Sequence, residues 1–311
     1  MAFLQAFGAY LPDHIVTNDE LAARLHCDAQ WIFTASGIRE RRQSGADESV
    51  VEMAVRAGAA CLERAKLGVG DVGAVIVASG TAAKRFPGPT AEVAIKLGCA
   101  SGVAALDVPM ASAGALYGLA LADAFASRYG NILVIASERM TDVAWREPAD
   151  PNTAILFGDG AGACVISNAS GLARIVDHAL HSDGAFTSDL RLEHDGTLAM
   201  EGRSVILQAS RKIPAALSAL LQRNSWPASA VDVLLMHQAN QNLMNRVAQS
   251  VGFPQERVHS VIEKTGNTSS ASMFIAASAW FDQQSSLTGK RLAFAAFGAG
   301  FHWGAMLAEG I

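Results

Sequence analysis

The sequence predicts a layered α/β fold that is duplicated within one chain. Short apolar runs of strand character alternate with longer helical runs, which is typical of helices packed on sheets. One order of strands and helices occupies residues 1–170 and is repeated in residues 171–311, so we treat these as two halves. Two helical runs, 111–130 and 269–284, are apolar on every face and should be buried on every side. We therefore expect five layers, αβαβα, with these two helices in the centre and their N-termini facing one interior site.

The first half carries a local signal for most of its elements. The predicted helices cover 48–65, 90–98 and 111–130, and the predicted strands cover 74–80, 104–108, 131–138 and 161–168. Asp47 or Ser49 lies near the start of the first helix, where an N-cap is expected. Gly98 and Gly130 end the other two helices, because glycine readily adopts the conformation of a helix C-terminus.

The second half repeats this order of elements. The predicted helices cover 205–222, 242–252 and 269–284, and the predicted strands cover 174–180, 231–237, 259–263, 291–298 and 303–310. Pro214 should mark a kink or a start in the first of these helices. The segment 183–203 is polar and weakly periodic, and we interpret it as an excursion over a functional site rather than a linker.

The composition favours a large core and argues against several classes of protein. Half of the 311 residues are apolar and 17% are charged. A net charge of −5 leaves no basic footprint for nucleic acid, although a local basic patch could contact an acidic partner protein. The N-terminus lacks a basic start, and no window holds 18 consecutive apolar residues. We expect neither a signal peptide nor a membrane span, and we expect a cytoplasmic protein.

The cysteines give no sign of a disulfide framework or a metal site. Cys27, Cys61, Cys99 and Cys164 form no CxxC pair and do not cluster with histidines at metal-ligand spacing. Each lies in an apolar or helical context. We expect all four to be reduced and buried, and we expect no metal.

Four short motifs follow predicted strands, where the sites of α/β proteins form. They are MASAG (110–114), HQAN (237–240), GNTSSAS (266–272) and FGAGFHWG (297–304). Singly, His237 could be a core histidine, Asn267 a turn residue and Ser112 a helix N-cap. Their joint occurrence on matching elements favours a catalytic site. The glycine-rich FGDGAGA (157–163) fits neither GxGxxG nor a P-loop, so nucleotide binding is not expected.

These motifs, with WIFTASGIRERR (31–42) and FPG (86–88), resemble ketoacyl-ACP synthase III over essentially the whole chain. The resemblance implies a thiolase fold, a homodimer and a Cys–His–Asn triad. His237 and Asn267 match the second and third members, and Ser112 stands where the family has its nucleophilic cysteine. The nucleophile would lie at the first turn of a buried helix, where the macrodipole favours negative charge.

The resemblance also assigns roles within the site. The backbone N–H groups of Ser112 and Ala299 would form an oxyanion hole for the acyl group. His237 and Asn267 would donate hydrogen bonds to the carbonyl of a malonyl thioester as it loses carbon dioxide. The residues implied to bind substrate are Trp31, Phe86, Leu156, Phe157, Arg203, Ile206, Asn240 and Phe297. The substrate would be acyl-coenzyme A or an acyl-carrier phosphopantetheine, with no further cofactor and with acyl carrier protein as a partner.

The serine at position 112 departs from this pattern. A helix N-terminus can bring a thiol to its thiolate, but it cannot ionise a hydroxyl, which needs a general base. His237 is the only candidate for that base, and it then cannot remain a neutral donor throughout. Three interpretations stay open: an engineered Cys→Ser change, a natural variant nucleophile, or a degenerate site in a non-catalytic subunit of a heterodimer.

The expected coenzyme A contacts differ too. Trp31 is present, but the two arginines that hold the adenine in the family align with Ala35 and Pro151, and a carrier-docking arginine aligns with Asn242. Arg203 replaces an asparagine that contacts pantetheine in the family. A carrier-bound or different donor therefore becomes plausible, unless these are surface contacts that vary freely. The rival functions are an ester- or amide-forming acyltransferase and the non-catalytic subunit.

Overall fold

The computed structural model describes residues 2–311, whose longest strands form one nine-stranded mixed sheet. The first half contributes β5 (Ala104–Val108), β4 (Val72–Ala78), β6 (Asn131–Arg139), β7 (Asp159–Ser167) and β1 (Phe3–Tyr10). The second half contributes β8 (Ala173–Ser182), β13 (His302–Gly310), β12 (Arg291–Gly298) and β11 (Val233–Met236). The two sets meet only where β1 pairs with β8 through Phe3 and Leu4, so they can splay apart on either side of a central layer.

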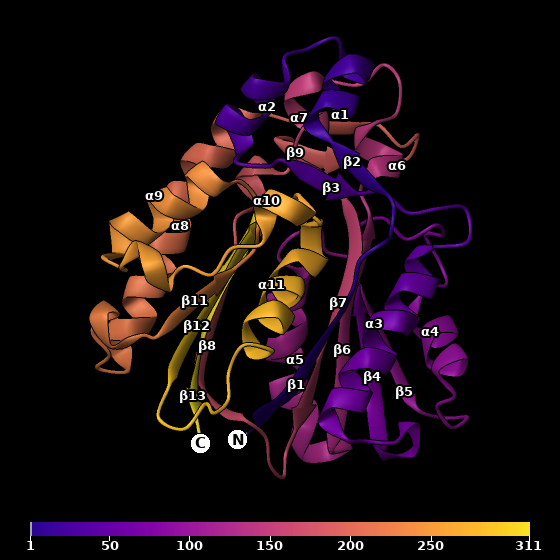
Figure 1. The fold of residues 1–311 in the computed structure, drawn as a ribbon. Helices are drawn as coiled ribbons and strands as arrows, with labels where there is room; N and C mark the ends of the chain where they lie inside the picture. The colour runs from indigo at the N-terminus through magenta and orange to yellow at the C-terminus, as the bar shows by residue number, and fades with distance from the viewer. Residues whose placement is uncertain (1) are drawn as a thin grey trace.

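Helices fill the space between the two sets of strands and cover both outer faces (Figure 1). The central layer consists of α5 (Gly114–Tyr129) and α11 (Ser272–Phe281), which contact strands of both sets. The outer layers consist of α3 (Val50–Ala65) and α4 (Thr90–Leu97) on one side, and α8 (Gly202–Arg223) and α9 (Gln241–Val251) on the other. This order of layers confirms the predicted fold class.

Shorter elements gather above one end of the layers, where the termini do not lie (Figure 1). The short helices are α1 (Asn18–Leu25), α2 (Ala29–Ser36), α6 (Thr141–Ala144), α7 (Pro151–Ala154) and α10 (Ile262–Thr265). The short strands form two pairs, β2 (Ile15–Thr17) with β3 (Glu40–Arg42), and β9 (Leu190–Leu192) with β10 (Leu198–Met200). The predicted excursion 183–203 contains the β9–β10 hairpin.

Most predicted elements occur within a few residues of their expected ends. Ser49 is the N-cap of α3 and accepts a hydrogen bond from the Glu52 N–H at 3.2 Å, while Gly98 ends α4 and Gly130 ends α5. Pro214 lies inside α8 rather than at its start.

One predicted strand is wrong. The predicted strand 259–263 is absent: residues 262–265 form the short helix α10, and just before it Val258 makes an isolated bridge to Leu234 of β11. Of the five strands predicted in the second half, four therefore join the sheet, and the β1–β8 pairing connects them to the strands of the first half. The two central helices also begin later than expected, at Gly114 and Ser272.

Burial of α11 explains why its sequence is apolar on every face. Every residue from Ser272 to Ser278 is buried. Close approach to the sheet depends on Gly162 of β7, where an added Cβ would lie 2.5 Å from the Cβ of Phe274. The C-terminal end of α5 is less enclosed, because Phe125 and Tyr129 remain 38% and 40% exposed.

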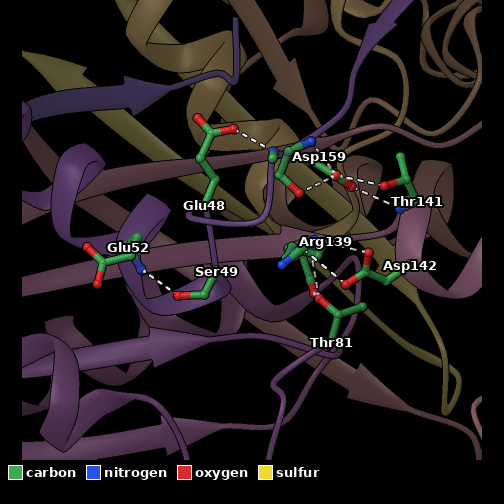
Figure 2. A network of polar contacts seen from close by, with 11 residues as sticks. Glu48, Ser49, Glu52, Thr81, Arg139, Thr141, Asp142 and Asp159 are labelled. Carbon is green, nitrogen blue, oxygen red and sulfur yellow. Dashed lines mark hydrogen bonds and ion pairs between the residues drawn. The ribbon is translucent and has the colours of Figure 1, made fainter. Parts of the chain in front are cut away.

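The glycine-rich motif at 157–163 contains a buried aspartate, Asp159, with four hydrogen-bond donors around it (Figure 2). Asp159 accepts hydrogen bonds from the N–H groups of Ser44 and Thr141, at 2.9 and 2.8 Å, and from both hydroxyl groups. Burial raises the pKa of this carboxyl, and the four donors oppose that rise. Asp159 thus links the start of β7 to Ser44, which follows β3, and to Thr141, which begins α6 after β6.

Two sequence expectations concern the chain as a whole. All four cysteines are free, and Cys61, Cys99 and Cys164 are buried as expected, whereas Cys27 is only partly buried. Within residues 2–311, the structure has no helix that is both long and apolar enough to span a membrane.

The packing of β1 against α3 gives a test of the fold. A Cβ added at Gly8 would lie 2.4 Å from the backbone N and 2.7 Å from the Cα of Cys61, so α3 would have to move. We expect Gly8→Ala to lower the free energy of unfolding by about 1–3 kcal/mol. Urea unfolding measures this loss. Gly70→Ala is the control, because nothing lies within 4 Å of its added Cβ. Equal midpoints for the two variants would contradict the packing.

Candidate active site

A cavity of about 530 Å³ brings the three predicted catalytic residues together. Ser112, His237 and Asn267 all line it, although they come from distant parts of the chain. Seven of the predicted substrate-binding residues line the same cavity: Trp31, Leu156, Phe157, Arg203, Ile206, Asn240 and Phe297. Phe86 does not line it and is 87% exposed on the surface.

Ser112 is held in an unusual backbone conformation directly before α5. Its φ of 61° lies in the left-handed region, which is uncommon for residues other than glycine. Its backbone N–H donates a hydrogen bond to Ser269 Oγ at 3.0 Å. Gly298 permits this close packing, since an added Cβ there would lie 2.9 Å from Ser112 Cβ. No side chain caps the N-terminus of α5. The partial positive charge of its free N–H groups therefore lies directly next to Ser112.

A second, smaller cavity of about 50 Å³ adjoins Ser112. It is mainly apolar, and its lining includes Met140, Val143, Leu198 and Ala299. Ala299, the second predicted oxyanion residue, therefore lies beside the serine but outside the larger cavity. Ser112 therefore lines both the larger and the smaller cavity.

His237 follows β11 and is almost completely buried. Its backbone N–H donates to the Ala295 carbonyl at 2.9 Å, which continues the pairing of β11 with β12. Its ring Nδ1 lies 2.6 Å from Ser272 Oγ. Burial lowers the pKa of the imidazole from 6.5 to about 4, because the charged form loses hydration. His237 is therefore neutral near pH 7.

The side-chain amide of Asn267 has a fixed orientation. Asn267 Oδ1 accepts a hydrogen bond from the Ser269 N–H at 2.9 Å, and Nδ2 donates to the Ala239 carbonyl at 3.3 Å. Its backbone N–H bonds to the Leu156 carbonyl at 2.8 Å, which joins the two halves of the chain. The N–H donor side of this amide is thus the side available to the cavity.

Three polar residues of the site were missed by the sequence analysis: Glu138, Ser269 and Ser272. Glu138 is completely buried and accepts hydrogen bonds from Thr81 Oγ1 at 2.6 Å, Ser270 Oγ at 2.7 Å and Ser269 Oγ at 3.0 Å. Burial raises the pKa of this carboxyl. A chain of hydrogen bonds therefore runs from the Ser112 N–H through Ser269 Oγ to a buried carboxyl. The run of serines in GNTSSAS was the available signal.

The mouth of the cavity lacks the arginines of the family pattern. Trp31 is 36% exposed and Ile206 is 41% exposed, so the rim is largely apolar. Asn242 Nδ2 donates to the carbonyls of Thr34 and Ala35, which ties it to α2. The excursion 183–203 does reach the cavity, because Leu190, Met200, Glu201, Gly202 and Arg203 line it.

The part of the chain that the structure describes contains no candidate set of metal ligands. No group of three or more His, Cys, Asp or Glu side chains within residues 2–311 is placed to hold an ion.

The lowered pKa of His237 predicts a pH-dependent loss of stability. The unfolded chain takes up this proton near pH 6.5, whereas the folded protein resists it down to about pH 4. Stability is therefore complete above pH 6.5 and falls as the pH drops toward 4, by roughly 3 kcal/mol from this group. Urea unfolding of the wild type and a His237→Gln variant should show a stability difference that shrinks by this amount on acidification. Parallel pH profiles would contradict the burial argument.

Comparison with known proteins agrees with this geometry. A family model described as 3-oxoacyl-[acyl-carrier-protein (ACP)] synthase III matches residues 106–184, and the model of its C-terminal part matches residues 221–309. Beta-ketoacyl-[acyl-carrier-protein] synthase III of Oceanobacillus iheyensis is 34% identical, with 96% of each chain covered. That of Aquifex aeolicus is 33% identical, again with 96% of each chain covered.

Solved structures agree as well. The crystal structure of 3-oxoacyl-[acyl-carrier-protein] synthase III from Aquifex aeolicus VF5 has a TM-score of 0.94 at 31% identity, covering 99% of this chain and 100% of that one. The priming beta-ketosynthase of the R1128 polyketide pathway has a TM-score of 0.90 at 28% identity, covering 99% and 96%. The chain belongs to the 3-oxoacyl-[acyl-carrier-protein] synthase III family of condensing acyltransferases.

Proposed function

We propose that this enzyme transfers an acyl group from an acyl-thioester to Ser112 and then condenses it with a malonyl-thioester to give a 3-oxoacyl product. The reaction would serve fatty-acid initiation or secondary metabolism. The observation that carries the proposal is one cavity lined by Ser112, His237 and Asn267. The names of the relatives support it, since they include both synthase III enzymes and a polyketide priming ketosynthase.

The first half-reaction forms an ester on Ser112. Ser112 Oγ attacks the thioester carbonyl, the C–S bond breaks, and the hydroxyl proton passes by way of His237 to the departing thiolate. The proposed oxyanion donors are the N–H groups of Ser112 and Ala299. Because the Ser112 N–H is bonded to Ser269 Oγ at rest, the oxyanion would compete with Ser269 for that donor.

The second half-reaction forms the carbon–carbon bond. The malonyl carboxylate leaves as carbon dioxide, and the enolate carbon attacks the ester carbonyl. The ester C–O bond then breaks, and Ser112 Oγ takes up a proton from water. Asn267 Nδ2 is placed to donate to the malonyl thioester carbonyl, because its Oδ1 is already bonded to the Ser269 N–H.

The donor is proposed to be bound to a carrier rather than recognised through the nucleotide of coenzyme A. The rim offers Trp31 and Ile206, with Asp150, Glu201 and Arg203 among its polar groups. Two carboxylates against one guanidinium leave this rim with a net negative charge, which disfavours the phosphates of coenzyme A, whereas the apolar side chains of the rim suit a pantetheine arm. We also propose that the protein is cytoplasmic and that it needs no metal or other cofactor.

A homodimer is proposed from the exposed edge of the sheet. Strand β5 ends the sheet and leaves Leu106 38% exposed, while the neighbouring α4 leaves Ile95 65% exposed. Phe86, which precedes α4, is 87% exposed. An unpaired edge beside such apolar side chains favours pairing with a second copy, and the family resemblance implies that Phe86 then approaches the partner's site.

Replacement of Ser112 tests the nucleophile. We expect Ser112→Cys to acquire an acyl group at least about tenfold faster, because a thiol ionises near neutral pH and a hydroxyl does not. Ser112→Ala should acquire none. Intact mass after incubation with several acyl-coenzyme A and acyl-carrier donors measures both.

Product analysis completes that test. Malonyl-carrier should yield a 3-oxoacyl product, whereas an ester or amide formed with an alcohol or amine acceptor would favour the rival acyltransferase. A Ser112→Cys variant that takes no label from any donor would leave the non-catalytic subunit as the explanation.

Sedimentation at micromolar concentration tests the dimer. We expect the wild type to sediment as a dimer and Leu106→Lys to shift it toward monomer, because a charge would be buried at the interface. Leu172→Lys is the control, since Leu172 is 47% exposed on a different part of the surface. A monomeric wild type would overturn the assembly.

A further inference from the structure

The hydroxyl of Ser272 lies at the junction of three polar groups. Ser272 Oγ is 2.6 Å from His237 Nδ1, 2.9 Å from the Ser269 carbonyl oxygen and 3.0 Å from the Gln238 backbone N. Ser272 and Gln238 are essentially inaccessible to solvent, so water is not available as a substitute partner. Every hydrogen at this junction therefore has to be assigned among these four groups.

The assignment is constrained by what each group can do. A backbone N–H can only donate and a carbonyl oxygen can only accept. Gln238 N–H thus occupies one lone pair of Ser272 Oγ, and the single hydroxyl hydrogen goes to the Ser269 carbonyl. The remaining lone pair of Ser272 Oγ faces His237 Nδ1, which must then carry the hydrogen.

The alternative arrangement makes one hydrogen bond fewer. If the Ser272 hydroxyl donated to His237 Nδ1, the Ser269 carbonyl would lose the hydroxyl as a donor, and an unprotonated Nδ1 could not donate to that carbonyl either, although the imidazole is within hydrogen-bonding reach of it. One lone pair of Ser272 Oγ would then be empty in a buried site, which is unfavourable. The arrangement with hydrogen on Nδ1 satisfies every group.

We propose that Ser272 is a positioning residue that holds His237 in the Nδ1–H form, so that its unprotonated Nε2 serves as the general base for Ser112 Oγ. His237 and Ser112 line the same cavity, and Nε2 lies on the side of the ring opposite the Ser272 contact. The inference rests on the proposed function, since it identifies the group that activates the serine nucleophile.

This assignment divides the roles of the site differently from the family resemblance. With hydrogen on Nδ1, the neutral ring presents an acceptor, not a donor, to the cavity. Asn267 Nδ2 is then the side-chain donor for a substrate carbonyl. A base is what a serine nucleophile requires, because a helix N-terminus alone does not ionise a hydroxyl.

The tautomer can be observed directly, without any substrate. In protein labelled with ¹⁵N-histidine, long-range ¹H–¹⁵N spectra at pH 7.5 distinguish protonated from unprotonated ring nitrogens, and His237→Gln assigns the signals. We expect protonated Nδ1 and unprotonated Nε2 in the wild type and in the control Ser278→Ala. Ser278 is buried on the same helix but bonds to Arg64 instead. Ser272→Ala should shift the signals toward Nε2–H. A wild-type Nε2–H form, or a tautomer unchanged by Ser272→Ala, overturns the proposal.

Acylation rates in two backgrounds separate positioning from a general structural defect. Acyl transfer from acetyl- and butyryl-coenzyme A and from acetyl-carrier protein is followed by intact mass. We expect Ser272→Ala to slow acylation of Ser112 by at least about tenfold, because general-base catalysis is lost. In the Ser112→Cys background the same substitution should slow acylation less than about threefold, since a thiolate needs less help.

Equal losses in both backgrounds would show a merely structural role and overturn the proposal. If no donor acylates either background, the proposed function fails, and the ¹⁵N spectra alone decide the tautomer. The two failures are therefore distinguishable.

Discussion

The hydrogen bonds of the turn from Asn267 to Ser272 hold the active site together. Ser269 takes part in four of them: its N–H donates to Asn267 Oδ1, its hydroxyl accepts from the Ser112 N–H and donates to Glu138, and its carbonyl accepts from the Ser272 hydroxyl. Ser112 and Ser269 both have positive φ values, of 61° and 49°. Two strained residues bonded to each other persist only where the surrounding structure fixes them, which is characteristic of functional sites.

A buried carboxyl, that of Glu138, supports this turn and forms no ion pair with any residue from 2 to 311. The carboxyl group of Glu138 lies inside the core and accepts hydrogen bonds from hydroxyl and backbone N–H donors, including Thr81 Oγ1 and the Gly80 N–H. Such groups can stabilise a buried carboxylate only if all of them point at it, so their orientations are coupled. One hydrogen-bonded network therefore links Glu138 through Ser269 to Ser112 and Asn267, and each member limits the freedom of the others.

The sequence predicted the elements whose signals are local. Glycines marked the ends of α4 and α5, and two all-apolar runs identified the central helices. The run at 259–263 failed because a short apolar segment does not distinguish strand from helix. The positions of Ser112, His237 and Asn267 around one cavity agree with the motifs, whereas their chemical roles and the division at residue 170 remain predictions.

Residues whose importance depends on distant partners could not be found in the same way. Ser269 and Glu138 are 131 positions apart, and Ser112 and Ser269 are 157 apart, so no spacing rule joins them. Strand β1 was also missed, although Gly8 within it is required for contact with α3. These features follow from three-dimensional packing and have no periodic signature.

The cavity of about 530 Å³ that Ser112, His237 and Asn267 share bears on the timing of the proposed reaction. In the proposed reaction, two thioesters that use the same space must bind in turn, so the acyl group would remain on Ser112 between the two binding events. An oxygen ester is attacked by thiols and carbanions less readily than a thioester, and the narrow cavity beside Ser112 is mainly apolar. Under the proposed function, a serine nucleophile would therefore give a slower first attack and a less reactive intermediate, which suits a second substrate that arrives rarely.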